Sequence, residues 1–335
     1  MAEEGNVKRA LVTGGCGFLG SSIVRALVPR GVEVRVLALP GEPPDNLEGL
    51  DVELVTGNVL DRAAVAAAVD GVDTVFHAAA IYKAWAPDPT SMYRVNLSGT
   101  FNMLEASRRA GVEKVIYTAS IVALGRPARG ALGDESTPYE AWDLDFSYSR
   151  SKYYSKELAF DFARWDTDVR VIYPGVVLGP GDITPTPSGK LIINALAGGP
   201  PMYTEGGISY VDVRDAAEAH VLAAERGEAG EGYIATGHNT TTKEFLETVF
   251  RVAGKKARLL KAPTAVARAA VRAMEAGAKR SGKEPLVTRD FFEYSLLPGF
   301  YSNEKARRKL GAEFRPLERT VADAIHYFRR RGMLK

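Results

Sequence analysis

A glycine-rich turn close to the N-terminus restricts the fold more than any other feature. Gly14, Gly17 and Gly20 lie where the apolar run 9–15 ends and a segment with helically spaced apolar residues, 18–31, begins. Gly14 allows a tight turn, Gly17 lets backbone approach a phosphate, and Gly20 lets the helix pack on the strand. Phosphates would then lie at the helix N-terminus, where free N–H groups and the helix dipole favour anions. The turn therefore predicts a dinucleotide-binding loop.

Apolar runs and helical segments alternate over about the first 175 residues. Strands are expected at 9–15, 32–39, 52–59, 73–79, 114–120 and 169–175, and helices at 18–31, 63–71, 96–111 and around 146–156. Continuously apolar strands joined by helices indicate a parallel sheet that is covered on both faces. We predict an α/β fold, a doubly wound parallel sheet (Rossmann) with a smaller, mostly helical C-terminal substrate lobe.

The composition of the chain changes after Gly175. Residues 177–207 are rich in Pro and Gly, 208–227 have the pattern of a strand and helix returning to the main sheet, and the chain from Thr241 onward is mostly helical. We therefore predict a dinucleotide-binding domain of residues 1–176 plus about 208–240, and a substrate-binding lobe of residues 177–207 plus about 241–335. In doubly wound sheets ligands bind at the carboxyl edge of the strands, where this lobe would lie.

Charge and cysteine content limit the range of partners. Lys and Arg number 43 against 41 Asp and Glu, so nucleic acid is not expected as a partner. The single cysteine, Cys16, excludes an internal disulfide and a thiolate metal cluster, and no metal site is predicted. The N-terminus has no signal-peptide pattern, and no run of about 18 apolar residues occurs. These features predict a soluble, cytoplasmic protein.

The end of the second predicted strand bears on the identity of the dinucleotide. An acidic residue there would bind the ribose hydroxyls of NAD, and an arginine would accept the 2′-phosphate of NADP. Leu39 occupies that place, and Glu42 and Asp45, which follow in the loop, would repel a phosphate. The cofactor is therefore predicted to be NAD or NADP, with a weak preference for NAD.

Tyr148 and Lys152 are four residues apart, which places them on one face of a helix. The same spacing recurs at Tyr301 and Lys305, so position in the fold must distinguish the pairs. Tyr148 follows the fifth predicted strand, which ends at Ser120. A free tyrosine has a pKa of about 10, and a nearby ammonium and a positively charged nicotinamide would favour the phenolate. With Ser120 holding a substrate oxygen, the trio indicates proton transfer coupled to hydride transfer; the alternative is a solvated helix face.

With these residues, the chain resembles the extended short-chain dehydrogenase/reductase family (the NAD-dependent epimerase/dehydratase superfamily) over essentially its whole length. Within it, the chain is most similar to the branch of dihydroflavonol reductases, 3β-hydroxysteroid dehydrogenases and hopanoid-associated epimerase-like proteins. The motifs that carry the resemblance, in chain order, are "TGGCGFLG" (13–20), "DTVFHAAA" (73–80), "YRVNLSGT" (93–100), "YTASIVALG" (117–125), Tyr148-x-x-x-Lys152, "YPGVVLGPGD" (173–182) and "YVDVRDAAEAH" (210–220).

This resemblance implies roles for individual residues. Ser120, Tyr148 and Lys152 would be catalytic, and Asn96 would order a water molecule in the proton relay. Asn58 stands where the family often has Asp, and family members commonly dimerise through the helices that contain 96–111 and 148–164, so a homodimer is expected. The implied cofactor contacts are Thr13, Gly14, Gly17, Phe18, Leu19, Gly20, Asn58, Val59, Ala78, Ala79, Lys152, Pro174 and Val176.

Aromatic residues around the cleft favour a hydrophobic substrate. Sugar-nucleotide epimerases of the family usually place Asn after the sixth strand, against the nucleotide diphosphate, and this chain has Tyr173 there. Phe146 precedes the catalytic tyrosine, and the substrate-binding residues are predicted to be Tyr82, Trp85, Trp142 and Ser120.

The sequence thus predicts an NAD(P)-dependent oxidoreductase that interconverts a secondary alcohol and ketone on a hydrophobic cyclic, sterol-like or flavonoid-like small molecule. The alternatives are an NDP-sugar epimerase or dehydratase and a non-catalytic dinucleotide-binding regulator. The amphipathic segment 264–280, with Arg268 and Arg272 one turn apart, is compatible with a weak peripheral membrane contact. A lobe helix with a solvated basic face is the favoured explanation of that segment.

Overall fold

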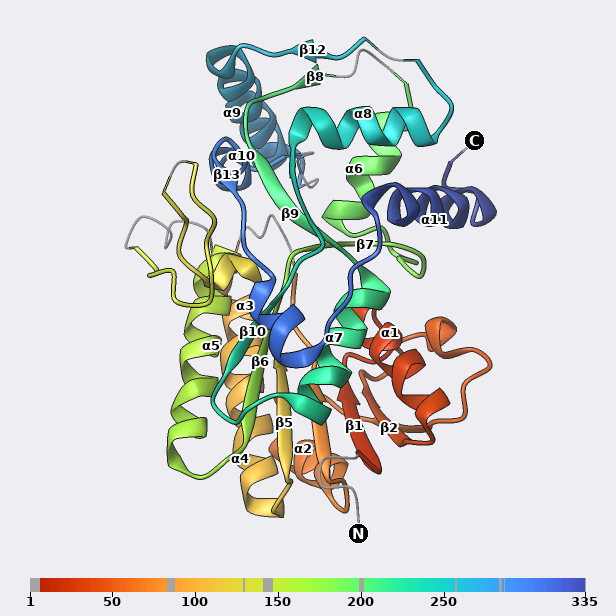
Figure 1. The fold of residues 1–335 in the computed structure, drawn as a ribbon, viewed down its shortest axis with the longest axis vertical. Helices are drawn as coiled ribbons and strands as arrows, with labels where there is room; N and C mark the ends of the chain where they lie inside the picture. Colours follow the sequence, from red (N-terminus) through yellow and green to blue (C-terminus); the bar gives the residue numbers. More distant parts are fainter. Residues whose placement is uncertain are drawn as a thin grey trace.

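A parallel sheet forms the centre of the larger domain in the computed structural model, which describes residues 7–82, 88–128, 130–140, 147–198, 202–256, 258–282, 285 and 287–334. The strand order is β10-β6-β5-β4-β1-β2-β3, and every neighbouring pair is parallel (Figure 1). Its strands are β1 (Arg9–Thr13), β2 (Glu33–Ala38), β3 (Glu53–Thr56), β4 (Thr74–His77), β5 (Lys114–Thr118), β6 (Val169–Pro174) and β10 (Gly232–Ala235).

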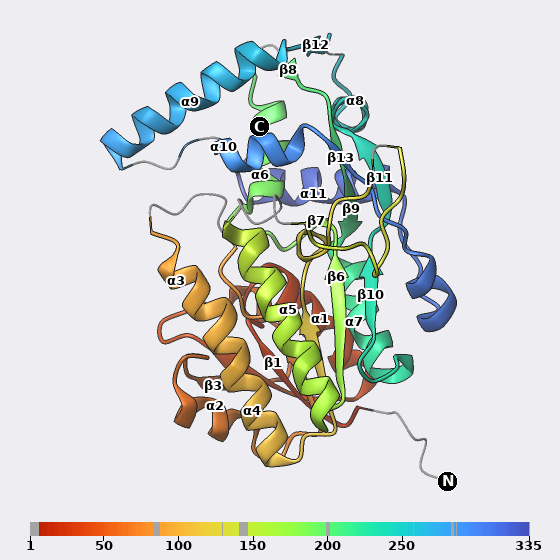
Figure 2. The same cartoon turned by 90° about the vertical axis from the view of Figure 1, so that its left-hand side faces the viewer.

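Helices cover both faces of this sheet, because its central strands are apolar on both sides. On one face Ile23 and Leu27 of α1 (Phe18–Leu27) share a core with Ala217 of α7 (Val213–Arg226). On the other face, α2 (Arg62–Val69), α4 (Thr100–Ala110) and α5 (Ser147–Trp165) bury apolar side chains that include Met103 and Phe162 (Figure 2). This arrangement confirms the predicted doubly wound parallel sheet.

The smaller lobe lies beyond the carboxyl ends of the strands (Figure 1). It has its own core, in which Phe245 stacks on Tyr210 and packs near Phe328. Its strands are β7 (Val176–Leu178), β8 (Met202–Tyr203), β9 (Gly207–Asp212), β11 (His238–Thr241), β12 (Leu260–Lys261) and β13 (Pro298–Gly299), and its helices are α6 (Pro187–Leu196), α8 (Thr242–Val252), α9 (Thr264–Ser281), α10 (Arg289–Ser295) and α11 (Leu317–Arg330).

The boundaries between the larger domain and the lobe differ in part from the predicted ones. Strand β9 pairs with β7, β11 and β13 of the lobe sheet, so the return to the main sheet begins with α7 and not at residue 208. Near the end of the chain, Ala306 and Leu310 pack in the core that contains α1 and α7. A short stretch of the lobe segment therefore belongs structurally to the larger domain.

The reversal of strand order places a crevice between β1 and β4. Strands β2 and β3 continue from one side of β1, whereas β4, β5 and β6 continue from the other. Loops that leave the carboxyl ends of β1 and β4 therefore diverge, and this is the point at which doubly wound sheets bind ligands. The glycine-rich turn follows β1, and Ala78 and Ala79 follow β4, so both predicted cofactor segments meet there.

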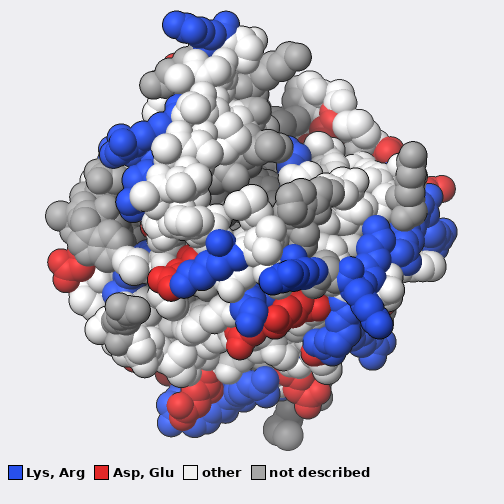
Figure 3. Space-filling view, turned by 90° about the horizontal axis from the view of Figure 1, so that it is seen from above, with Lys and Arg blue, Asp and Glu red and all other residues white. Residues whose placement is uncertain are grey.

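The surface carries basic and acidic groups together. Seen from above, Lys and Arg lie in separate groups around a broad uncharged area, with Asp and Glu among them (Figure 3). Arg268 of α9 pairs with Glu293 of α10 through two contacts of 2.5 and 2.8 Å, which supports a helix packed within the lobe. Within the described chain, no helix combines the length and apolarity needed to cross a bilayer, and no cluster of His, Cys, Asp and Glu has metal-site geometry.

Two histidines are fully buried beside the carboxyl ends of β4 and β5. His77 contacts the hydroxyls of Thr13 (2.8 Å) and Thr100 (3.1 Å). His220 Nδ1 donates to the Ala216 carbonyl (2.7 Å), and its Nε2 lies 2.9 Å from the Thr118 hydroxyl. Burial, followed by the charge of Lys152, lowers the pKa of His77 to about 3. Burial also lowers the pKa of His220 to about 4.

These pKa values predict a loss of stability in mild acid. The unfolded chain binds a proton at each histidine below its ordinary pKa of 6.5, whereas the folded chain does not. The free energy of unfolding should therefore fall, by up to about 1.4 kcal/mol per pH unit for each histidine, as the pH drops from 6.5 towards 4. Denaturant unfolding of wild type, His77→Asn and His220→Asn at pH 7 and 5 measures this. Each variant should show a shallower pH dependence, whereas His326→Asn, at an exposed site, should match wild type. Equal slopes in all four proteins would contradict the assignment.

Candidate active site

The glycine-rich turn forms a cradle that side chains would fill. Gly14 has φ +68°, and a Cβ there would lie 3.0 Å from Ala79 Cα and N. A Cβ on Gly20 would overlap the carbonyl oxygen of Gly14, so the first turn of α1 can pack on the loop only with glycine. Gly17 caps α1 in an extended conformation with its N–H on Gly14 O (3.0 Å). The loop thus fits a dinucleotide phosphate bound on backbone N–H groups.

A cavity of about 420 Å³ runs from this turn to the Tyr148 helix. Most of the predicted cofactor residues line it: Gly14, Gly17, Phe18, Leu19, Gly20, Asn58, Val59, Ala78, Ala79, Lys152, Pro174 and Val176. Thr13 does not; it is buried, and its hydroxyl accepts from Ala79 N (3.1 Å) and so braces the turn from behind.

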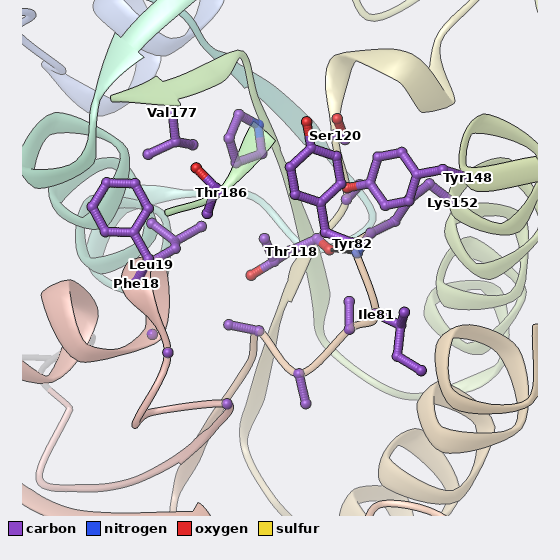
Figure 4. Close-up of a pocket in the computed structure, with 18 of the residues that line it drawn as sticks. Phe18, Leu19, Ile81, Tyr82, Thr118, Ser120, Tyr148, Lys152, Val177 and Thr186 are labelled. Atoms are coloured by element: carbon purple, nitrogen blue, oxygen red, sulfur yellow. Dashed lines mark hydrogen bonds between the residues drawn. The ribbon is translucent and has the colours of Figure 1, made fainter. Parts of the chain in front are cut away.

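The predicted catalytic residues meet at the end of the cavity opposite the glycine turn. Ser120 follows β5, and Tyr148 and Lys152 lie on the buried side of α5. Figure 4 shows these side chains together with Tyr82 on one side, while Phe18, Leu19, Val177 and Thr186 lie on the other. The Tyr148 hydroxyl is hydrogen-bonded to Ser120. The sequence-predicted trio is therefore assembled, although its catalytic role stays a prediction.

Lys152 is buried against uncharged groups. It is 4% exposed, and its Nζ donates to the Thr118 carbonyl oxygen (2.8 Å) and lies 5.4 Å from the centre of the Tyr117 ring. Tyr117 in turn donates its hydroxyl proton to Ser155 (2.6 Å). Loss of water around the ammonium lowers the pKa of Lys152 to about 7. The amine is therefore held in place by dipoles, and its proton is labile at neutral pH.

The pKa of Tyr148 differs from the sequence-based expectation. A neighbouring ammonium was expected to acidify the phenol. In the structure, burial raises the pKa of Tyr148 well above its ordinary value, the nearby Tyr82 and Tyr117 raise it further, and the hydrogen bond from Ser120 lowers it only partly. The physical reason is desolvation, which disfavours a phenolate in an apolar pocket. The protein's own groups around Tyr148 therefore favour the neutral phenol.

Asn96 is buried and is not among the residues that line the cavity. It sits in a π-helical segment, Arg94–Gly99, and its amide accepts from Ile81 N (2.8 Å) and donates to Ile81 O (3.2 Å) and Ser151 Oγ (3.0 Å). Its backbone carbonyl accepts from the Thr100 hydroxyl (2.7 Å). These bonds fix the chain at Ile81, which does line the cavity. A relay water at Asn96 stays a prediction.

Aromatic residues from distant parts of the chain close the substrate end. The Tyr82 ring lies 4.8 Å from the Tyr148 ring. Phe291 and Tyr294, from α10 of the lobe, line the same cavity, and the Arg126 guanidinium stacks 3.8 Å from the Tyr294 ring. The sequence analysis did not identify Phe291 and Tyr294; the only available signal was an aromatic pair three residues apart in a short helix. Trp85, Trp142 and Phe146 lie outside the described residues.

Two other tyrosines are excluded from the site. Tyr173, at the place where epimerases of the family have Asn, is 1% exposed, and its ring packs against Gly232. Tyr301, of the second Tyr-x-x-x-Lys pair, donates to the Gly125 carbonyl (2.9 Å), while Lys305 contacts Glu231. Tyr301 and Lys305 are thus structural.

The chain matches a known protein family. Residues 10–235 match the NAD dependent epimerase/dehydratase family. The chain belongs to this family, which confirms the resemblance seen in the sequence, and its cofactor is NAD. A UDP-glucose 4-epimerase from Thermus thermophilus, solved in complex with NAD, has the same fold at 25% identity, a TM-score of 0.75, and coverage of 96% of this chain and 99% of that one.

The similar proteins include named reductases and sterol enzymes. A Synechocystis sp. protein provisionally named dihydroflavonol 4-reductase is 33% identical, over 97% of this chain and 95% of the relative. Sterol demethylase protein B of Methylococcus capsulatus is 31% identical, over 97% and 99%. The crystal structure of gox2253 superposes with a TM-score of 0.87 at 37% identity, covering 98% of this chain and 100% of that one. The protein is thus similar to oxidoreductases along its full length.

Replacing Lys152 should remove activity without lowering the free energy of unfolding at pH 7. The unfolded chain keeps the Lys152 proton up to a pH of about 10.5, whereas the folded chain releases it near 7, so burial of the amine costs on the order of a few kcal/mol at neutral pH. Lys152→Met should abolish turnover, unfold at pH 7 with at least the wild-type free energy, and lose the rise in stability that wild type gains from this group between pH 7 and 10. Activity assays and denaturant unfolding measure these effects.

Lys156, one turn further along α5 and paired with Glu157 (2.7 Å), provides the matched control. Lys156→Met should retain turnover and the wild-type rise in stability with pH. Full activity in Lys152→Met would contradict the role given to this amine.

Proposed function

We propose that this protein is an NAD-dependent dehydrogenase or reductase, 3β-hydroxysteroid dehydrogenase-like, that interconverts a secondary alcohol and ketone on a hydrophobic cyclic substrate. The observation that carries the proposal is the Ser120–Tyr148 pair at the apolar end of the cavity. Ile81, Val122 and Phe291 line this end beside the two hydroxyls. An apolar wall with a few convergent polar groups suits a sterol-like or flavonoid-like molecule with one reacting oxygen.

The residues of the site would act as follows. Ser120 holds the substrate oxygen by a hydrogen bond, and Tyr148 donates a proton to it in ketone reduction or accepts one in alcohol oxidation. Lys152, one turn further along α5 and poorly solvated, would stabilise the phenolate that remains after donation. NAD, when bound, supplies the hydride donor or acceptor. Tyr82 and the α10 aromatics exclude water from the reacting oxygen.

An NDP-sugar epimerase or dehydratase is the second candidate. Thr186 and Ser188 at the start of α6 line the cavity and give it a polar stretch, with hydroxyls that donate to Asp182 and to the Val177 carbonyl. Against this candidate, Lys152 is the only cation among the described lining residues, and Tyr173 replaces the expected amide with a buried ring. A sugar diphosphate would therefore meet few compensating groups. A non-catalytic regulator is the third reading, and the presence of Ser120, Tyr148 and Lys152 disfavours it.

A substrate panel distinguishes these candidates. The protein is incubated with NADH and with steroid ketones, flavonoid ketones or UDP-glucose, and NADH absorbance and products are followed. Net NADH consumption with a cyclic ketone supports the proposal. Conversion of UDP-glucose without net change in NADH supports the epimerase, and cofactor binding without any turnover supports the regulator.

We also propose that the molecule forms a homodimer through α4 and α5. Three aromatic residues are exposed on these helices: Phe101 (38%), Tyr154 (43%) and Trp165 (69%). Phe162 lies between two of them, with ring centres 5.9 Å from Phe101 and 5.2 Å from Trp165. An aromatic surface of this kind on two adjacent helices is typical of an association surface.

Removal of the Tyr148 hydroxyl should stop chemistry without affecting the cofactor. Tyr148→Phe is expected to lower kcat by about 100- to 10,000-fold, the usual contribution of a general acid, while the affinity for NADH stays within about twofold of wild type. Steady-state kinetics and fluorescence titration measure the two quantities. Tyr154→Phe, on the exposed side of the same helix, is the control and should be fully active. If Tyr148→Phe kept wild-type kcat, the mechanism would be wrong.

Charge placed on the aromatic surface should separate the subunits. Phe101→Glu combined with Trp165→Glu is expected to shift the protein from dimer to monomer, because two buried carboxylates per subunit would oppose association. Analytical ultracentrifugation gives the mass. Leu191→Glu, at an exposed apolar residue of the lobe, should leave the mass unchanged. A monomeric wild-type protein would refute the dimer.

A further inference from the structure

Arg126 is a buried cation to which the proposed mechanism gives no role. It lies in the chain that continues from Ser120, is 9% exposed and is not among the described residues that line the cavity. Its guanidinium carbon lies 3.8 Å from the centre of the Tyr294 ring, and its Nη1 donates to the Leu297 carbonyl (3.2 Å). Tyr294 is in α10 and Leu297 follows that helix, so Arg126 connects the larger domain to the lobe.

Tyr294 carries this connection to the substrate end of the cavity. Tyr294 and Phe291 line the cavity and pack against a small apolar cluster that contains Val122 and Tyr148. In Figure 2, α10 lies above the end of α5 at which Tyr148 stands. The Tyr294 ring thus contacts the guanidinium of Arg126 and also forms part of the wall beside the proposed catalytic residues.

Further hydrogen bonds join the same two segments of the chain. The Tyr301 hydroxyl donates to the Gly125 carbonyl (2.9 Å), directly before Arg126. Gly133 N donates to Phe300 O (2.8 Å). These bonds secure the chain that follows β13, whereas the contacts of Arg126 reach α10 and the residue with which its aromatic side chains are carried into the cavity wall.

Helix α10 is held from two sides, and the two contacts differ in what they can fix. Glu293 of α10 pairs with Arg268 of α9 through contacts of 2.5 and 2.8 Å. Both of these residues belong to the lobe, so the pair cannot set the distance between α10 and Ser120. Arg126 belongs to the larger domain, so its contact with Tyr294 can set that distance.

We propose that Arg126 is a positioning residue for the substrate, which fixes the Tyr294 ring and with it the aromatic wall opposite Ser120 and Tyr148. A guanidinium is attracted to the face of an aromatic ring, and the attraction is stronger where water is excluded. The hydrogen bond to Leu297 O gives this contact a direction, because the N–H groups of a planar guanidinium point along fixed lines. This inference rests on the proposed function, since the wall would hold the ring system of a hydrophobic cyclic substrate.

Steady-state kinetics test the proposal with the cyclic ketone that wild type reduces fastest in the substrate panel. Arg126→Met removes the cation and the donor but keeps an apolar stem, and it should raise KM for the ketone by about tenfold or more. The value of kcat and the affinity for NADH should stay within about threefold of wild type, because Ser120, Tyr148 and the glycine turn are unchanged. Arg126→Lys keeps a cation but not the planar group, so its KM should lie between those of wild type and Arg126→Met.

A matched control and a double-mutant cycle show whether Arg126 acts through the ring. The Arg307 guanidinium lies 5.3 Å from the centre of the Phe314 ring, and neither residue is among those that line the cavity. Arg307→Met should therefore keep the wild-type KM. In a Tyr294→Leu background, Arg126→Met should raise KM by a smaller factor than it does in the wild-type background, because the ring through which it acts is absent.

Hydrogen exchange provides a measurement that needs no substrate. Backbone amides of α10 should exchange faster in Arg126→Met than in wild type or Arg307→Met, because one of the two contacts that hold the helix is lost. Thermal denaturation verifies that all variants are folded.

The proposal fails if Arg126→Met keeps the wild-type KM, if it lowers kcat without changing KM, or if it raises KM equally in both backgrounds. Unchanged exchange in α10 would also refute it. If wild type reduces no ketone of the panel, the proposed function fails instead, and the exchange measurement alone decides whether Arg126 holds α10.

Discussion

The buried amine of Lys152 is the interaction around which the catalytic end of the molecule is arranged. No carboxylate pairs with it among the described residues, and the Thr118 carbonyl and the face of Tyr117 are its neighbours. A buried cation disfavours further positive charge nearby, and the Lys152 charge is one of the causes that lower the pKa values of the two buried histidines. The threonines that bond these rings come from β1, α4 and β5. The charge of the amine thus acts on two histidines whose hydrogen bonds reach β1, α4 and β5.

Lys152 and Tyr148 respond to the same desolvation in opposite senses. Burial lowers the pKa of the amine towards neutrality and raises that of the phenol, so both groups are shifted towards their uncharged forms. A neutral phenol can donate a proton to a carbonyl oxygen, and a phenolate can accept one from an alcohol. Proton acceptance requires stabilisation of the phenolate, and a protonated Lys152 is the group of the chain positioned to provide it. In the proposed mechanism the two residues would therefore act together, with the phenol moving the proton and the amine stabilising the phenolate.

Local sequence patterns predicted most of the nucleotide-binding half, because its function depends on short strands and the turns that follow them. The glycine turn, predicted from its own pattern, lines the cavity together with Ala78, Ala79 and Pro174, which the family resemblance implied. The substrate end was harder to predict, since Phe291 and Tyr294 reach it only through docking of the lobe, which no local pattern encodes. Glu42, whose carboxylate accepts from Leu39 N (3.0 Å), is positioned by one turn that the sequence suggests only through Gly41. The pairing of β9 with the lobe sheet was missed for the same reason, because strand partners are set by tertiary contacts.

The distribution of charge in the cavity explains why the glycine turn is so tightly built. A dinucleotide carries two phosphates, yet no described lining residue near the turn is a cation, so its charge must be balanced by backbone N–H groups and the dipole of α1. Such groups act only at close range, which requires that no Cβ stand between them and the phosphates. The close approach of Gly14 to Ala79 and of Gly20 to Gly14 sets the turn at that range. Glu42 and Lys152 are the charged residues among the described residues that line the cavity, and backbone N–H groups supply the polar contacts at the turn.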